Sequence, residues 1–286
     1  MAALEQALSQ PEQADLAVLR EFRGVPWVDQ LHAQRQNQSA GAILEHARRD
    51  YAAAIAPLSA PPVIEVAGIE LRLVPAGRFR LGDEWQDGEA DEQPSAAAEI
   101  ARPFYLGTCE VTQAQWQAVM GENPSRGAHA ANLPVDSVSL AGVATFLQKT
   151  GLRLPTEVEW EYAAKTGTGL KYAIGNLPED LDRVAWHQQN SGGAAQPVAT
   201  RAPNAWGFYD LLGNVHEWCA TPYAPSPALA VQASQALASG GDPRPRALRG
   251  GSWSAAARAL RVSARDRCEP TSTGGAIGVR AARDVD

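Results

Sequence analysis

Cysteine is scarce in this sequence, which has only Cys109, Cys219 and Cys268 among its 286 residues. Three widely separated thiols are too few for a disulfide framework, and they lack the paired spacing of a zinc cluster. We therefore expect a reduced protein in a cytoplasmic setting.

Long hydrophobic runs and an excess of positive charge are also missing. No apolar stretch approaches the roughly 18 residues that cross a bilayer, and the first twenty residues carry acids where a secretory signal would be apolar. The formal net charge is −7, whereas general nucleic-acid binding requires a basic surface that neutralises phosphates. The sequence thus predicts no membrane and no nucleic acid as partner. Its 45% hydrophobic content is typical of a globular protein with a core.

The composition of the chain changes near residue 60. Residues 1–60 are rich in Ala, Leu, Gln and Glu, and apolar positions such as Ile43, Ala47 and Tyr51 recur at helical spacing. This pattern predicts two or three amphipathic helices, which offer a surface for assembly into oligomers. The proline-containing run 58–63 then stops the helical pattern. We expect a helical N-terminal extension over 1–60 and one larger domain over 63–286.

Regular elements are expected mainly in the first half of the larger domain. The β-like runs 64–74 and 77–81 flank a Pro-Ala-Gly turn signal and predict a hairpin. Helices are expected near 112–120 and 140–148, each followed by a glycine, and over 156–165, where Thr156 and Glu159 form a capping box. After Gly167 the chain is mostly Gly, Pro, Asn, Ser and Ala with interspersed tryptophans. Such a long irregular stretch is unusual in a compact domain.

Several sequence segments explain this irregular half. They are, in chain order, LVPAGRFRLG (73–82), FYLGTCEVTQAQWQAVMG (104–121), LPVDSVS (133–139), LRLPTEVEWEYAAKTG (152–167), APNAWGFYDLLGNVHEW (202–218), LRGGSW (248–253) and IGVRAARD (277–284). In this order and spacing they resemble the formylglycine-generating-enzyme superfamily, also known as sulfatase-modifying factors. The resemblance covers roughly residues 63–286.

The resemblance implies an α+β fold class, namely an irregular C-type-lectin-like domain of the formylglycine-generating-enzyme type, here with a short helical N-terminal extension. In such a domain, buried tryptophans hold an irregular backbone in place. The superfamily includes copper enzymes, the catalytic domains of sulfoxide synthases and some pyoverdine-maturation proteins.

The residues required for the superfamily's copper chemistry are missing. The resemblance places two cysteines shortly after the GGS-aromatic motif, where the soft thiolates hold Cu(I). Here the motif at 250–253 is followed by residues 254–261, which contain no cysteine. The HxxxHxE motif of the sulfoxide synthases is absent as well. We expect no copper cofactor and no catalytic residues of that type.

A structural calcium site is the metal centre that the resemblance implies. It carries over to the side chains of Asp210 and Glu217 and the carbonyls of Gly213 and Val215, which are the hard oxygen ligands that calcium prefers. The alternative is that both acids only hydrogen-bond a tight loop. The adjacent His216 is expected to point away from Glu217. A second calcium site has no clear counterpart, since Asn190 is its only candidate ligand.

The tryptophans and the acidic loop are expected to serve structure and solubility. Trp116, Trp160, Trp218 and Trp253 lie within the family motifs and are predicted to be core residues, whereas Trp85 and Trp186 are candidates for exposure. The acidic segment 82–94 reads as a solvated surface loop.

The C-terminal segment has an unusual composition. No asparagine occurs from Val215 onward, although the resemblance implies many there, and the small residue types present can all be reached from an AAC codon by changing only its adenines. This resembles the variable proteins of diversity-generating retroelements, whereas a GC-rich genome explains the composition equally well. The candidate variable face comprises Trp253, Ser254, Ala255, Ala256, Arg258, Asp266, Cys268, Ser272, Thr273, Gly274, Gly275 and Ala276. Arg261 and Arg265 are candidates for structural roles.

Three functions fit these observations. The first is a non-copper, non-catalytic protein that binds an unidentified protein or small molecule through the face at about 253–276. The second is an oxidoreductase of the sulfoxide-synthase or pyoverdine-maturation type with a non-copper centre. The third is a regulatory or scaffold role in which the N-terminal helices assemble oligomers.

Overall fold

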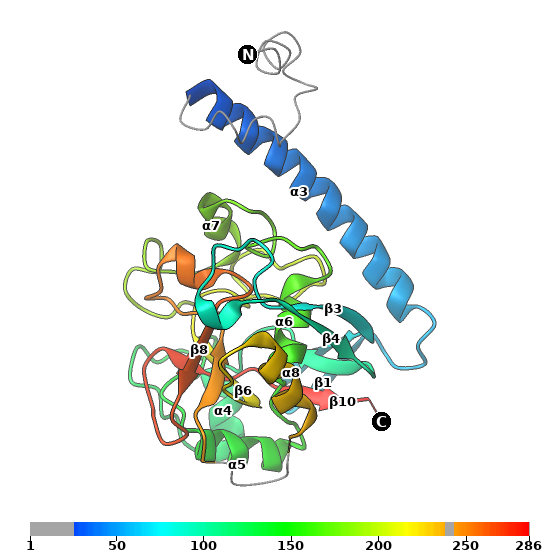
Figure 1. The fold of residues 1–286 in the computed structure, drawn as a ribbon. Coiled ribbons are helices and arrows are strands. Elements are labelled where there is room, and N and C mark those ends of the chain that lie inside the picture. Colours follow the sequence, from blue (N-terminus) through cyan, green and yellow to red (C-terminus); the bar gives the residue numbers. More distant parts are fainter. Residues whose placement is uncertain (1–25, 238–242, 286) are drawn as a thin grey trace, which may run out of the picture.

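The computed structural model describes residues 26–237 and 243–285. One long helix, α3 (Pro26–Ile55), precedes a body in which short strands and helices are joined by irregular segments (Figure 1). The expected α+β fold with a helical N-terminal segment is confirmed. None of the helices in the described ranges combines the length and apolarity needed to cross a bilayer.

The first sheet has the strand order β1-β2-β5-β10 and is antiparallel. Its strands are β1 (Val63–Val66), β2 (Ile69–Val74), β5 (Phe104–Gly107) and β10 (Ala282–Asp284). It therefore joins segments from both ends of the described body. β5 is buried along its whole length.

The hairpin forms at a different turn from the one expected. The strands β1 and β2 pair around Ala67 and Gly68, whose φ angles of 52° and 76° suit the left-handed positions of a two-residue hairpin turn. The turn at 75–77 instead separates two sheets, because β3 (Gly77–Leu81) pairs with β4 (Ala96–Ile100) and not with β2. The prediction of a hairpin across 75–77 is wrong.

The second four-stranded sheet has the order β8-β7-β6-β9. Antiparallel pairs join β6 (His216–Pro222), β7 (Arg246–Arg249) and β8 (Arg265–Cys268), and β9 (Ile277–Gly278) runs parallel to β6. The turn of helix η4 (Ala257–Leu260) lies between β7 and β8. Of the C-terminal segment 253–276, only β8 belongs to this sheet, and β7 and β9 flank the segment.

The predicted helices of the body are confirmed, with the glycines that end two of them and the capping box that begins the third. Thr112 caps α4 (Gln113–Met120), Ser139 caps α5 (Leu140–Thr150), and the Thr156–Glu159 capping box begins α6 (Glu157–Lys165). Gly121 and Gly151 end α4 and α5 in the left-handed conformation. Beyond α6 the described body has only short helices: η3 (Pro178–Asp180), α7 (Leu181–Val184) and α8 (Pro227–Gln235), besides η4. The short η2 (Ala90–Glu92) lies earlier in the chain.

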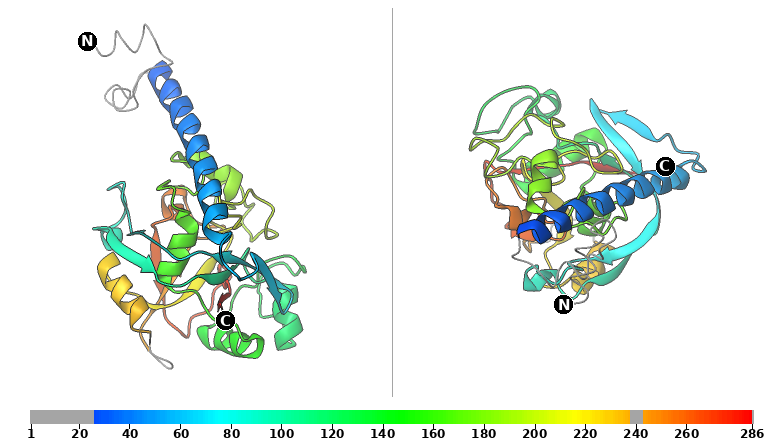
Figure 2. Two further views of the ribbon diagram at one scale, coloured as in Figure 1. Left: turned by 90° about the vertical axis from the view of Figure 1, so that its right-hand side faces the viewer. Right: turned by 90° about the horizontal axis from the view of Figure 1, so that it is seen from above.

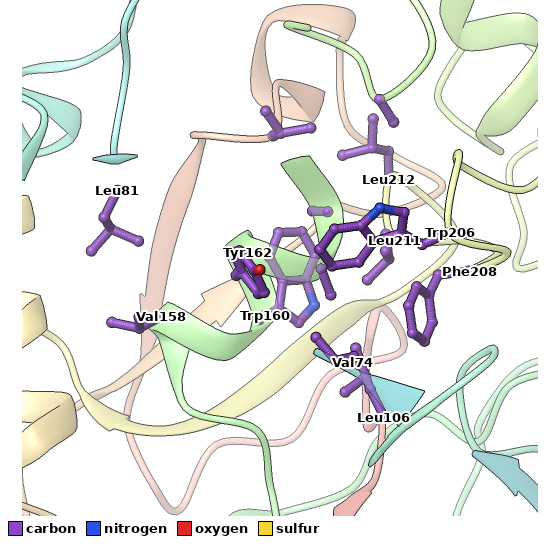
Figure 3. Close-up of a cluster of buried hydrophobic side chains, with 14 of the residues drawn as sticks. Val74, Leu81, Leu106, Val158, Trp160, Tyr162, Trp206, Phe208, Leu211 and Leu212 are labelled. Atoms are coloured by element: carbon purple, nitrogen blue, oxygen red, sulfur yellow. The ribbon is translucent and has the colours of Figure 1, made fainter. Parts of the chain in front are cut away.

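Two hydrophobic clusters stabilise this irregular backbone. One is centred on α6, whose Trp160 and Tyr162 lie beside Trp206, Phe208 and other side chains from distant segments (Figure 3). The other includes Trp116 and Trp218, which are buried with strands of the first sheet and with α5. Trp253 departs from expectation, because it is only half-buried and its indole N–H donates to the Gly275 carbonyl, 3.1 Å away.

Helix α3 is continuous over its 30 residues, so the described part of the extension holds one helix and not several. Its first half extends beyond the body, and its second half lies against it (Figure 2). Ala47 and Tyr51 are buried there, and the Tyr51 hydroxyl donates to the Leu73 carbonyl at 2.7 Å. The expected helices before residue 26 lie outside the described residues.

Candidate functional site

A small hollow lies on the C-terminal face, where η4 and β8 meet the second sheet. Its volume is about 170 Å³. It is lined by Glu89, Glu92, His216, Leu248, Gly250, Gly251, Arg258, Ala259, Arg261, Ala264, Arg265 and Asp266. It therefore combines the GGSW motif with two members of the candidate variable face, Arg258 and Asp266.

The two glycines of the motif are required by the local geometry. Gly250 and Gly251 have φ angles of 91° and 72°, which L side chains rarely adopt. A Cβ at Gly250 would lie 3.0 Å from the Leu211 carbonyl oxygen, and one at Gly251 would collide with Leu260. The sharp turn brings the following segment back onto the body, where the Trp253 amide donates to the Asn214 carbonyl at 2.7 Å.

Two arginines of the hollow are structural, as the sequence suggested. The Arg261 guanidinium pairs with Glu92, and both side chains are buried. Arg265 forms a bidentate pair with Glu157 at 2.7 and 2.9 Å, with both side chains fully buried. Both cations are neutralised inside the protein, so neither supplies free charge to a ligand.

The pair between Arg261 and Glu92 also corrects the prediction for the acidic loop. Segment 82–94 is not simply solvated, because Glu92 and Asp83 are buried. The Asp83 carboxylate accepts the backbone amides of Trp85, Asp87 and Gly88, which lower its pKa against the effect of its burial. Two acids thus organise the loop that forms one side of the hollow.

His216 is a lining residue that the sequence analysis did not assign to this site. Its Nε2 lies 3.9 Å from an Asp266 carboxylate oxygen. Its Nδ1 is buried, and no hydrogen-bond partner for it occurs in the part of the chain that the structure describes. Burial lowers the pKa of His216, and the nearby Asp266 opposes this effect. The ring therefore keeps one buried nitrogen without a partner in the described residues, while its Nε2 lies toward Asp266.

Arg258 is the cation of the hollow that stays exposed. Within residues 26–237 and 243–285, no ion pair of its guanidinium occurs, in contrast to Arg261 and Arg265. Arg258 and Asp266 therefore place opposite charges on the accessible side, while His216 contributes a polar nitrogen.

The other predicted face residues are not among those that line the hollow. Exposed or half-buried positions include Ser254, Ala256, Cys268, Thr273 and Gly275. The backbone beneath them is fixed: Ala255 accepts from the Gln188 amide, Gly274 accepts from the Ser137 amide, and Pro270 accepts from the Leu140 amide. The remaining members of the predicted set are Ala255, Ser272, Gly274 and Ala276, which are half-buried.

The residues predicted to hold calcium lie in the interior. Glu217 is fully buried, and its two oxygens accept from the Arg280 guanidinium at 2.7–3.0 Å. The same carboxylate accepts the Trp160 indole N–H at 2.6 Å. Arg280 also donates to the carbonyls of Gly107 and Tyr209. Glu217 is thus the counter-ion of a buried guanidinium, and as predicted it points away from His216.

Asp210 and Glu110 extend this buried cluster. Asp210 accepts the Ala199 amide with one oxygen, while its other oxygen is buried without a partner in the described residues. Glu110 accepts from the Asn214 side chain and from the Val215 amide. Burial raises the pKa of Asp210 to about 6, and burial together with the charges of Asp210 and Glu217 raises the pKa of Glu110.

These contacts do not fit a calcium ion at Glu217, because the ion would have to displace Arg280 from a complete set of hydrogen bonds. No group of three His, Cys, Asp or Glu side chains suited to a metal occurs in the described residues. Asn190, the candidate ligand of a second site, bonds instead to Asp182 and Ala185. The geometry favours the alternative of a hydrogen-bonded loop, and calcium binding itself stays a prediction.

The cysteines do not form a thiolate pair. All three are free. Burial raises the pKa of Cys109 to about 12 and raises that of the fully buried Cys219 as well. Because the thiolate is the form that binds soft metals, these two thiols are poor ligands at neutral pH.

Comparisons with known proteins agree on one family. The family model described as "Sulfatase-modifying factor enzyme 1-like domain" matches residues 66–285. The formylglycine-generating enzyme of Streptomyces coelicolor is 29% identical, over 74% of this chain and 88% of its own length. Treponema denticola variable protein 1 has a TM-score of 0.65 at 27% identity, covering 78% of this chain and 98% of that one. PvdO from Pseudomonas aeruginosa has a TM-score of 0.68 at 25% identity, covering 79% and 100%.

Proposed function

This chain belongs to the family with the sulfatase-modifying factor enzyme 1-like domain, and from that premise we propose that it is a ligand-binding member which uses the face at about 253–276. The observation that carries the proposal is a contrast between backbone and side chains. The backbone of this face is hydrogen-bonded to the body at Trp253, Ala255, Pro270 and Gly274, while many of its side chains are exposed. Such a face can change its side chains at little cost in folding free energy.

The centre of the binding site is the hollow beside η4. A volume of about 170 Å³ admits a small group, such as one side chain of a protein partner or one end of a small molecule. Arg258 and Asp266 offer opposite charges, and the Nε2 of His216 lies beside Asp266 in the lining. Polar groups of this kind fix the orientation of a ligand.

The likeness to Treponema denticola variable protein 1 supports this proposal, since that chain is covered almost completely. The diversity-generating retroelement version makes a further claim about the gene. Sequencing its neighbourhood tests this claim, and we expect a reverse transcriptase together with a near-identical repeat of the 253–276 coding segment. If both are missing, the retroelement version is wrong, whereas the binding face remains testable on the protein.

The alternative is an oxidoreductase with a non-copper centre. The 29% identity to a formylglycine-generating enzyme favours it. The raised pKa values of the half-buried Cys109 thiol and the buried Cys219 thiol argue against the copper chemistry. Elemental analysis of purified protein separates the two functions. Stoichiometric redox-active metal would contradict the non-catalytic proposal.

The binding proposal is tested by exchanging charges on the face. Binding of a small-molecule panel and a peptide library is measured with wild type, with Arg258→Glu/Asp266→Arg, and with the control Arg102→Glu/Glu122→Arg, whose exposed residues lie off the face. We expect the face variant to weaken ligands of the hollow at least tenfold, while the control leaves their Kd unchanged. Ligands that bind all three proteins equally would show that the face is not the site.

A further inference from the structure

The largest hollow described here lies away from the C-terminal face, between α3 and the body. Its volume is about 610 Å³, which is within the range of small-molecule sites. One wall is a face of α3, which precedes the matched family segment at 66–285. Its lining includes Ile43, Asp50 and Tyr51 of α3 and Tyr162, Thr166 and Trp206 of the body.

Aromatic residues form the base of this hollow. The rings of Tyr51 and Trp206 stack with centroids 5.3 Å apart, and the Tyr162 ring meets Trp206 edge-on at 5.1 Å. Figure 3 shows Tyr162, from α6, beside Trp206. The side walls are alanines, Ile43 and Pro75. A site of this composition suits a flat, largely apolar molecule.

Two polar groups at the base have no partner in the described part of the chain. The Trp206 indole nitrogen and the Thr166 hydroxyl are buried and unbonded. The Tyr162 hydroxyl lies near them and approaches Gly77, where a Cβ would collide with it. Unbonded buried polar groups cost free energy, so each needs an explanation. A hydroxyl-bearing ligand provides one.

Thr166 is also strained. It ends α6 with a φ of 50°, in the left-handed region that a β-branched residue rarely adopts. Gly167 follows it, also with a positive φ, and both line the hollow. Backbone strain of this kind concentrates at binding sites. It is a second observation, independent of the unbonded atoms.

The rim of the hollow carries a negative charge. Asp50 lies on α3, exposed, and its carboxylate is 3.2 Å from the exposed His46 imidazole. No other Asp or Glu lines the hollow, and no Lys or Arg does so. An ionised carboxylate has no hydrogen to donate, so it accepts hydrogen bonds and attracts cations. The charge therefore favours a ligand with an amine at the end that faces α3.

We propose that the hollow between α3 and the body binds a small aromatic amine, with the ring over the Tyr51, Tyr162 and Trp206 base and the ammonium group at Asp50. A hydroxyl on the ring would serve as a partner for the unbonded polar groups of the base. The Trp206 indole nitrogen can only donate, so the hydroxyl oxygen would accept from it. This site is separate from the proposed face at 253–276 and does not depend on its function.

Three matched probes test the ligand class by calorimetry: tyramine, which has both ring hydroxyl and amine, phenethylamine, which lacks the hydroxyl, and 4-methylphenol, which lacks the amine. We expect tyramine to bind most tightly and each of the other two to bind several-fold more weakly. No heat of binding from any probe at millimolar concentration would overturn the proposal. Equal affinity for tyramine and 4-methylphenol would overturn the assignment of the amine.

Variants of α3 locate the site. Ile43→Trp places a large ring in the hollow and should weaken tyramine at least tenfold. Arg49→Trp is the matched control, because Arg49 is exposed on the same helix and does not line the hollow. Asp50→Asn should weaken tyramine about two- to fivefold, the size expected for an exposed ion pair, and leave 4-methylphenol unchanged. Undiminished binding to Ile43→Trp would place the ligand elsewhere and overturn the proposal.

Discussion

Glu217 shows how a single carboxylate holds distant parts of this protein together. It lies in β6, accepts the Trp160 indole from α6, and forms the ion pair with Arg280, which follows β9. A buried pair is costly to form, but removing one partner leaves the other charge uncompensated in a medium of low dielectric constant. The stability of the protein should therefore depend strongly on this residue.

We predict that Glu217→Ala lowers the free energy of unfolding by about 3–5 kcal/mol, since it strands the Arg280 guanidinium. Cys268→Ala is the comparison, because Cys268 is half-buried at the edge of β8, and its loss should cost about 0.5 kcal/mol or less. Urea denaturation of both variants and the wild type measures this difference. A large defect in Cys268→Ala would show that its segment is packed core and not a display surface.

The raised pKa of Asp210 determines how the free energy of unfolding should change with pH. Burial raises its folded-state pKa to about 6 from an ordinary value of 3.8, so the native state takes up the proton first as the pH falls. This preferential protonation of the native state stabilises it fully below the unfolded-state pKa of Asp210. The stabilisation is lost as the pH rises through about 6. A shift of about two pH units corresponds to roughly 3 kcal/mol. Glu110, whose pKa is also raised, acts in the same direction.

The wild type should therefore gain stability between pH 7 and pH 5, and Asp210→Asn should lose much of this gain, because an amide needs no proton and keeps an oxygen for the Ala199 amide. Urea denaturation at several pH values in this window gives the slopes. Identical slopes for the two proteins would mean that Asp210 is not the group that titrates.

Chelation of calcium tests whether Arg280 or a bound calcium ion neutralises Glu217. Because Arg280 occupies both oxygens of Glu217, we expect EDTA to change the wild-type Tm by no more than about 1 °C. A ligand that binds only the folded state would stabilise it by mass action. A Tm that falls by several degrees in chelator and recovers with added calcium would restore the calcium interpretation.

At the scale of elements, the attachment of α3 rests on a few side chains. Tyr51 is the largest of the buried ones, with its ring on Trp206 and its hydroxyl on the Leu73 carbonyl. Truncating a buried aromatic residue costs about 3 kcal/mol or more. This contact lies in the second half of α3. Its loss should therefore destabilise the attachment of the helix and leave the stability of the body unchanged.

We predict that Tyr51→Ala raises the rate of proteolytic cleavage within residues 40–56 by about a hundredfold, the factor that corresponds to roughly 3 kcal/mol of local stability. Tyr51→Phe, which keeps the ring and loses only the hydroxyl, should raise the rate far less. Mapping the cleavage sites by mass spectrometry provides the measurement. Cleavage that increases equally throughout the body would show that α3 and the body unfold together.

Local signals predicted the elements that depend on neighbouring residues. The caps at Thr112, Ser139 and Thr156 are side-chain contacts three residues apart, so the helices they begin could be placed from sequence. The hairpin was misplaced because Pro75 to Gly77 carries a stronger turn signal than Ala67-Gly68. Which strand pairs with which is decided by the path of the chain between sheets, and a turn signal does not encode it.

At the scale of the whole molecule, the candidate site could be predicted only in part. The motif at 250–253 located the face, and the structural roles of Arg261 and Arg265 were anticipated. Their partners were not, because Glu92 and Glu157 are 169 and 108 residues away in the chain. His216 gave no signal at all, since a histidine beside a structural glutamate has no spacing that marks a binding site.

The positions of β9 and β10 bear on how the protein is made. Each is an edge strand of one four-stranded sheet, and Arg280 lies between them. While the ribosome is still translating residue 270, both sheets lack a strand and the Glu217 carboxylate lacks its cation. The nascent domain therefore cannot reach its native state co-translationally until this segment has left the exit tunnel, and its exposed sheet edges are open to chaperones until then.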